Sequence, residues 1–169
     1  IMNYRLGGNF NSVLNMILRE ETGYTYGASS YFTGMKNFGL FVAGASVRSN
    51  TTEESLRIFH ESIQKYPTET NDEDLAFTKN ALLRSNAMNF ETLSSLVDIL
   101  DNIAMYNLPV DYVQKEVDVL QKITLDEHHA LAKKYLNPKR MIYVIAGDAA
   151  TQLPKVQATG IGEVVKYGL

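Results

Sequence analysis

Apolar residues near the start of the chain first follow a helical period and then form two strand-like runs. From Asn9 to Glu21 they recur three and four residues apart, which predicts an amphipathic helix. The helical positions are Phe10, Val13, Leu14, Ile17 and Leu18. Tyr24 to Thr33 and Phe38 to Arg48 read as strands, and Gly34 to Asn37 between them suit an antiparallel turn. The second run is nearly all apolar, which is typical of a strand buried on both faces.

A block of helices follows the two strands. Apolar stripes predict helices over residues 51–67, 70–90, 93–107, 110–120 and 124–136. The spacings of Thr51 with Glu54 and of Thr124 with Glu127 fit capping boxes. Pro67 and Pro138 are expected to end their helices.

The last part of the chain carries a weaker pattern. Arg140 to Ala146 is predicted to be a buried strand, and residues 149–169 form a weakly patterned tail with a short strand at Val164 and Val165. Segregated strands and helices favour an α+β fold, with an antiparallel-rich sheet packed against the block of helices. We expect one domain over residues 1–169.

Composition excludes several classes of function. The 169 residues include no cysteine, so disulfides, thiolate metal sites and a cysteine nucleophile are ruled out. A formal net charge of −3 argues against nucleic-acid binding, which needs a basic face. The sequence has no run of about 18 apolar residues that would span a membrane. The expectation is a soluble protein of unknown compartment, cytoplasmic or periplasmic.

The three histidines do not complete a metal motif. His60 and Glu61 begin a His-Glu-x-x-His pattern, but Gln64 stands where the second imidazole is needed. His128 follows a glutamate as in the inverted motif, yet Thr124 occupies the first ligand position. The spacing of His128 on an apolar stripe predicts a packed, hydrogen-bonded side chain, so we expect no metal site in this chain.

One constellation combines a cation with phenols around a tight turn. Arg19 stands at a predicted helix end, Gly23 is suited to a left-handed cap, and Tyr24 and Tyr26 head the next strand. On composition alone this segment also fits a purely structural role, with Arg19 paired to a neighbouring glutamate and the tyrosines on a half-buried sheet.

The segments around that turn carry a family resemblance. LGGNFNSVL (6–14) running into LREETGYTY (18–26), NLPVDY (107–112), ITLDE (123–127), AKKYLNP (132–138) and VIAGD (144–148) occur in a characteristic order. Together they resemble the C-terminal-type domain of the M16 zinc metallopeptidases, the pitrilysin, insulysin and mitochondrial processing peptidase family. The resemblance implies a LuxS/MPP-like fold and covers the chain from about residue 4 to residue 148.

The resemblance implies the non-catalytic half of a clamshell peptidase. The partner half, in the same or a separate polypeptide, would bind zinc through His-x-x-Glu-His, and this half would lend an arginine and a tyrosine to extended peptide substrates. Arg19 and Tyr24 match that pair, and Tyr26 is the alternative phenol because the longest family pattern separates the two by seven positions rather than five. This chain alone is expected to be inactive and to bind no cofactor.

Two further expectations come with the resemblance. Such domains usually begin with a strand and a helix before the Leu-Gly-Gly segment, so this chain is expected to be a fragment without them. The exposed sheet edge would then allow a homodimer. Two alternatives keep the fold without the chemistry: a structural scaffold subunit, or a stand-alone module that binds peptides.

Overall fold

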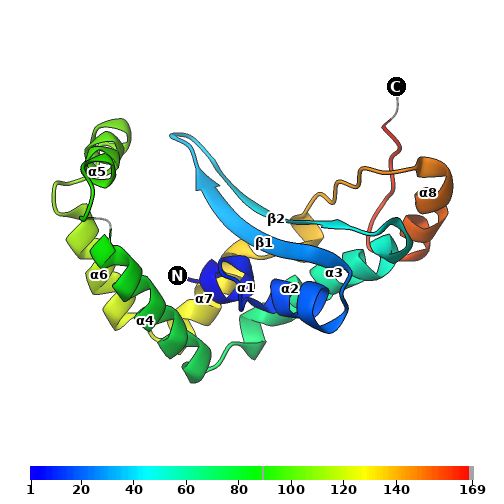
Figure 1. Cartoon of the computed structure of the whole chain (residues 1–169), viewed down its shortest axis with the longest axis horizontal. Helices are drawn as coiled ribbons and strands as arrows, with labels where there is room; N and C mark the ends of the chain where they lie inside the picture. The colour runs from blue at the N-terminus through cyan, green and yellow to red at the C-terminus, as the bar shows by residue number, and fades with distance from the viewer. Residues whose placement is uncertain (89, 168–169) are drawn as a thin grey trace.

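A two-stranded antiparallel ribbon crosses a layer of helices in the computed structural model, which describes residues 1–88 and 90–167 (Figure 1). The N-terminal part comprises α1 (Asn3–Gly7), α2 (Val13–Asn15), the π-helical turn η1 (Met16–Glu21), β1 (Thr25–Gly34) and β2 (Gly39–Val47). The strands lie within two residues of their predicted positions and pair with each other alone in the described chain. The α+β class is therefore confirmed.

The helical part follows β2. Its elements are η2 (Ser49–Thr51), α3 (Thr52–Glu69), α4 (Asp72–Met88), α5 (Leu93–Tyr106), α6 (Tyr112–Lys122), α7 (Leu125–Tyr135), η3 (Pro138–Arg140) and α8 (Ala149–Ala158). The capping box at the start of α7 is confirmed, because Thr124 accepts from the Glu127 amide and the Glu127 carboxylate accepts from the Thr124 amide.

The core lies between the ribbon, the N-terminal helices, α3 and α7. Its buried members come from all of these elements and include Leu6, Leu14, Leu18, Ala28, Ile63, Tyr66, Ala132 and Leu136. Gly7 allows the closest approach, because a Cβ at this position would lie 2.5 Å from the Ser30 backbone nitrogen. A side chain on Gly7 would therefore push α1 away from β1.

The predicted strand over Arg140 to Ala146 is wrong. Within the described residues the backbone from Ile142 to Ala146 is irregular and makes no backbone hydrogen bond. Met141 packs on the core, while Ile142 and Val144 are 90% and 88% exposed. The segment has the alternation of a strand, but it lacks the neighbouring strand that would make it one.

Several element boundaries also differ from the predictions. Helix α1 precedes the expected first helix, which begins at Val13 rather than Asn9, and α3 contains Pro67 rather than ending there. The tail folds into α8, begun by the Asp148 side chain, which accepts from the Ala150 amide, and the predicted strand at Val164 and Val165 is absent.

Two predictions about burial and capping are wrong as well. No residue of β2 is buried, because a two-stranded ribbon leaves one face open. Thr51 does not cap α3, since its hydroxyl donates to the Arg48 carbonyl instead.

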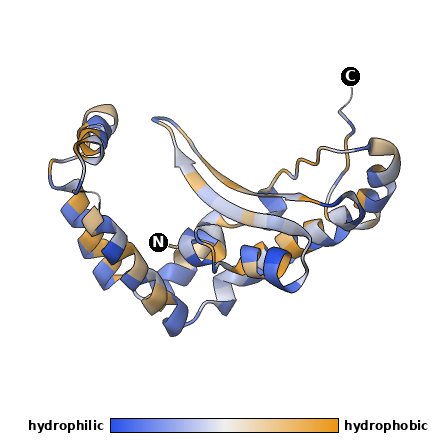
Figure 2. Cartoon of the chain, in the orientation of Figure 1, coloured by the Kyte–Doolittle hydropathy of each residue, from blue (hydrophilic) through white to orange (hydrophobic). Residues whose placement is uncertain are grey.

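Helix α5 stands apart from the core at the hairpin tip (Figure 1). None of its residues is buried, and the Tyr106 hydroxyl donates to the Gly34 carbonyl at 3.3 Å. Figure 2 shows hydrophobic residues along α4 and α6 and near the tip of the ribbon. Exposed residues among these elements include Phe77, Val119 and Leu40.

Candidate functional site

The turn from η1 into β1 fixes the position of the candidate residues. Gly23 has φ +63°, in the left-handed region that glycine adopts without strain. Its amide donates to the Arg19 carbonyl at 3.2 Å, and the Tyr24 amide donates to the Leu18 carbonyl at 2.9 Å. The turn thus connects the end of η1 directly to the first residues of the ribbon.

Arg19 lies over an aromatic ring. Its guanidinium carbon is 4.5 Å from the centroid of Phe10, and its Nε is 3.4 Å from a Glu20 carboxylate oxygen. A guanidinium over a ring is held there by cation–π attraction. Phe10 was expected on the buried stripe of the first helix, and this is wrong: its ring is exposed on the loop between α1 and α2.

The two tyrosines have different environments. Tyr24 is half-buried and packs against the core, whereas Tyr26 is 99% exposed. The exposure of Tyr26 follows from a β-bulge, because Tyr26 and Gly27 together lie opposite the single residue Ser46.

The bulge is held by a threonine hydroxyl. Thr25 Oγ1 donates to the Ser46 carbonyl at 2.7 Å and accepts from the Gly27 amide at 3.1 Å. Bulges of this kind redirect a side chain and are frequent next to active sites.

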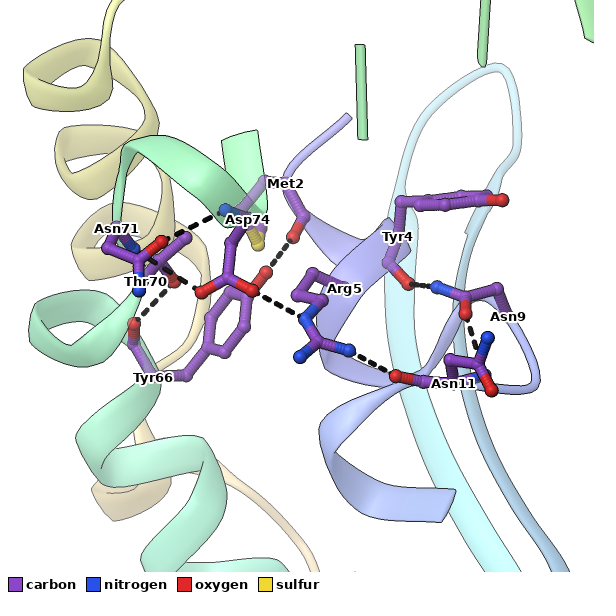
Figure 3. A network of polar contacts seen from close by, with 9 residues as sticks. All are labelled: Met2, Tyr4, Arg5, Asn9, Asn11, Tyr66, Thr70, Asn71 and Asp74. Atoms are coloured by element: carbon purple, nitrogen blue, oxygen red, sulfur yellow. Dashed lines mark hydrogen bonds and ion pairs between the residues drawn. The ribbon is translucent and has the colours of Figure 1, made fainter. Parts of the chain in front are cut away.

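A polar network holds the loop that carries Phe10 (Figure 3). Arg5 Nε lies 2.6 Å from Asp74 on α4, and its guanidinium also donates to the Asn11 carbonyl. Asn9 donates to the Tyr4 carbonyl at 2.6 Å and accepts from the Asn11 amide at 2.8 Å. These contacts tie the loop to α1 and α4, so the ring beneath Arg19 rests on a fixed backbone.

Asparagine side chains close part of the outer edge of β1, the edge away from β2. The Ala28 amide donates to Asn15 Oδ1 at 3.0 Å, and Asn3 Nδ2 donates to the Ser30 carbonyl at 2.7 Å. In an antiparallel pair the N–H and C=O of one residue point to the same edge, so these contacts occupy the positions of a further strand.

The structure therefore brings Arg19 together with Phe10, but gives it no hydrogen bond to Tyr24 or Tyr26 within the described residues. Sequence reasoning missed Phe10 and Asn15. Phe10 was assigned to the buried helical stripe because its spacing matches that stripe. Asn15 could not be recognised from a local pattern, because its partner Ala28 lies 13 residues away in another element.

The histidines offer no metal site. Among residues 1–88 and 90–167 no group of three or more metal-binding side chains is placed to hold an ion. The described residues therefore offer a zinc ion no such group of ligands. His60 is half-buried and its Nδ1 lies 2.9 Å from the Tyr143 hydroxyl.

His128 is a buried residue of α7, as its stripe predicted. It is 1% exposed, and its Nδ1 has no hydrogen-bond partner among the described residues. Burial, followed by the neighbouring His129 and the terminal amino group, lowers the pKa of His128, whereas a backbone hydrogen bond at Met2 and the charge of Asp74 oppose the shift.

No helix in the described part of the chain has the length and apolar character needed to cross a membrane.

The described residues form an α+β domain, and comparisons with known proteins show what it resembles. Residues 1–82 match the family model described as the Peptidase M16 inactive domain. A crystal structure of a peptidase M16 inactive domain from Pseudomonas fluorescens has a TM-score of 0.74 and 28% identity, covering 80% of this chain and 32% of that chain. The chain therefore resembles the M16 inactive domain, in the sequence of residues 1–82 and in its fold.

Two proteins from Helicobacter pylori are also similar. The "Non-peptidase homolog YmxG" (strain ATCC 700392 / 26695) is 26% identical over 152 residues, which is 88% of this chain and 34% of that protein. The crystal structure of a protease has a TM-score of 0.66 at 16% identity, covering 80% of this chain and 33% of that chain, and shows the fold alone. The chain thus spans about a third of the length of each relative.

Proposed function

We propose that this chain is the non-catalytic, substrate-binding half of an M16-type zinc peptidase. It works opposite a partner half that carries zinc on a His-x-x-Glu-His motif, and it binds extended peptide segments between the two. The observation that carries the proposal is the half-buried Arg19, whose guanidinium lies over Phe10 in a domain that resembles the inactive M16 type.

The chemistry of the site supports this role. Hydrolysis of a peptide bond places negative charge on the carbonyl oxygen, and a pre-positioned N–H or O–H donor stabilises it by roughly 3–4 kcal/mol. Arg19 offers guanidinium donors, and a phenol from the head of β1 offers a hydroxyl. The zinc of the partner half supplies the activated water.

Between the two phenols, the geometry favours Tyr26 over Tyr24. The bulge turns Tyr26 fully into solvent, while Tyr24 packs against the core. Tyr24 was the first choice from the sequence. We propose Tyr26 as the phenol that meets substrate and Tyr24 as a packing residue.

The first experiment measures hydrolysis of an unstructured fluorogenic peptide. The chain alone is expected to be inactive and to retain no stoichiometric zinc after dialysis, and activity is expected when a His-x-x-Glu-His half is added. Activity of the chain alone would contradict the proposal, and so would bound zinc.

Matched variants of the mixed halves separate the residues. Arg19→Ala and Tyr26→Phe are expected to lower turnover at least tenfold, in line with loss of one oxyanion donor. Tyr24→Phe keeps the packed ring and is expected to leave turnover unchanged. Loss of turnover in Tyr24→Phe with no effect of Tyr26→Phe would return the role to Tyr24.

A second candidate is a non-peptidase role as a scaffold or peptide-binding module. The observation that favours it is the name of the Helicobacter pylori relative, a non-peptidase homolog. Binding of an extended peptide that is not cleaved in the presence of any zinc-bearing half would support this candidate over the first.

If two copies associate through a sheet edge, β2 is the edge we propose. The outer edge of β1 is occupied at Ala28 and Ser30 by asparagine side chains, whereas β2 pairs only with β1 in the described chain. Size-exclusion chromatography with light scattering would test this by measuring the mass of the Ala43→Pro variant. The variant is expected to be a monomer, because proline blocks pairing along β2.

A further inference from the structure

We propose that Asn15 is a positioning residue whose buried amide couples the Arg19–Phe10 stack to the bulge that presents Tyr26. The inference rests on the proposed function, since it concerns the same site. It adds a residue that touches neither substrate nor metal and acts through its neighbours.

Both ends of the Asn15 amide are engaged. The side chain is 3% exposed at the end of α2, where the helix changes into the π-helical turn η1. Its Nδ2 donates to the Phe10 carbonyl at 2.7 Å, and its Oδ1 accepts from the Ala28 amide at 3.0 Å. One donor and one acceptor in opposite directions fix the orientation of the amide group.

The first bond acts on the stack. Holding the Phe10 carbonyl sets where the Phe10 ring lies relative to η1. Arg19 stands four residues after Asn15, about one helical turn along the same continuous segment. Asn15 therefore helps to position both the Phe10 ring and the Arg19 guanidinium. This explains why the two groups lie 4.5 Å apart although the ring is exposed.

The second bond acts on the bulge. Ala28 is the first residue that regains register with β2 after the bulge, opposite Ala45. Thr25 Oγ1 holds the bulge from its N-terminal side, and the Asn15 bond to Ala28 holds it from its C-terminal side. Tyr26 thus projects from a backbone segment that is fixed at both ends.

Asn3 provides a matched control within the same chain. It also reaches the outer edge of β1, where it donates to the Ser30 carbonyl at 2.7 Å and accepts from the Ser30 hydroxyl at 2.5 Å. It makes no hydrogen bond to Phe10 or to the bulge residues. If Asn15 only stabilised the outer edge of β1, its removal would therefore affect the Arg19–Phe10 stack no more than removal of Asn3.

The test uses NMR of the isolated chain. In the wild type, the Arg19 side-chain protons are expected upfield of their usual positions because of the Phe10 ring current. Asn15→Ala is expected to abolish this upfield shift and the protection of the Ala28 amide, whereas Asn3→Ala keeps both. Retention of the shift in Asn15→Ala, or its loss in both variants, would overturn the proposal.

A second variant keeps the proposal testable if Asn15→Ala does not fold. In Asn15→Asp an ionised carboxylate still accepts from Ala28 but repels the Phe10 carbonyl, whereas a protonated carboxyl both accepts and donates. The Arg19 shift is expected to be absent at high pH and to return on acidification. A shift that fails to return, while the wild type keeps its own at the same pH, would overturn the inference.

Activity of the mixed halves separates this inference from the proposed function. Asn15→Ala is expected to lower turnover, and its effect is expected to be smaller in the Arg19→Ala background than in the wild type, because the part that acts through the Arg19–Phe10 stack is already lost. Full activity of Arg19→Ala would refute the proposed function and leave the NMR result intact. Additive losses would refute the coupling.

Discussion

At the scale of the residue, position in the ribbon decides what each side chain does. Two tyrosines separated by one residue differ in environment because a bulge lies between Thr25 and Ala28. Strict alternation would have placed both on one face of β1. The extra residue turns Tyr26 out and leaves Tyr24 against the core.

Gly7 should be intolerant of a side chain. Gly7→Ala places a Cβ 2.5 Å from the Ser30 backbone nitrogen, so α1 must shift from β1. We expect a loss of about 1–3 kcal/mol in the free energy of unfolding, measured by urea denaturation. Gly44→Ala is the control: its Cβ meets nothing within 4 Å, and equal losses in the two variants would contradict the argument.

His128 should make stability depend on pH. Its pKa in the folded chain lies below the ordinary value of 6.5, so the unfolded chain binds the proton more readily. The free energy of unfolding is therefore expected to be highest above about pH 6.5 and to fall as the pH decreases through the folded pKa.

Chemical denaturation at a series of pH values between about 5 and 8 measures this dependence. The slope is expected to be smaller in His128→Gln, which cannot be protonated. An unchanged slope in that variant would assign the pH dependence to other groups.

At the scale of the element, sequence patterns predicted a feature correctly where all the residues that form its hydrogen bonds lie in one short segment. The capping box of α7 involves only Thr124 and Glu127, three residues apart, and it was predicted. The cap expected at Thr51 was not found, because its hydroxyl donates to the Arg48 carbonyl. The bulge and the Asn15 contacts need residues from separate elements, which no local pattern encodes.

Removing the α7 cap should have a measurable cost. Thr124→Ala deletes the acceptor for the Glu127 amide and is expected to lower the free energy of unfolding by about 1 kcal/mol. Thr124→Ser retains the hydroxyl and should retain most of the stability. Thermal or urea unfolding measures both, and equal losses would argue against capping as the cause.

At the scale of the whole molecule, the class of fold was predictable and the pairing of its strands was only partly so. The hairpin joins neighbours in sequence, and its short loop and apolar runs predicted it. The segment Ile142–Ala146 has the composition of a strand, yet its pairing depends on a partner that the described chain does not provide.

Hydrogen exchange should report the open segment. The amides of Ile142 and Val144 are expected to exchange at nearly unprotected rates, while amides within the paired part of β1 are slowed. Strong protection of these two amides would contradict the prediction and show that the segment is paired in solution.

The bulge at Tyr26 has a consequence for how the length of this chain can change. Because Tyr26 and Gly27 share one opposite residue, deleting Gly27 would remove the bulge and leave the rest of the hairpin register intact. Inserting or deleting a residue beyond Ala28 would instead turn every later side chain of β1 to the other face. Within β1, a change of length is therefore expected to be tolerated best at the bulge, where deleting Gly27 would redirect the Tyr26 side chain.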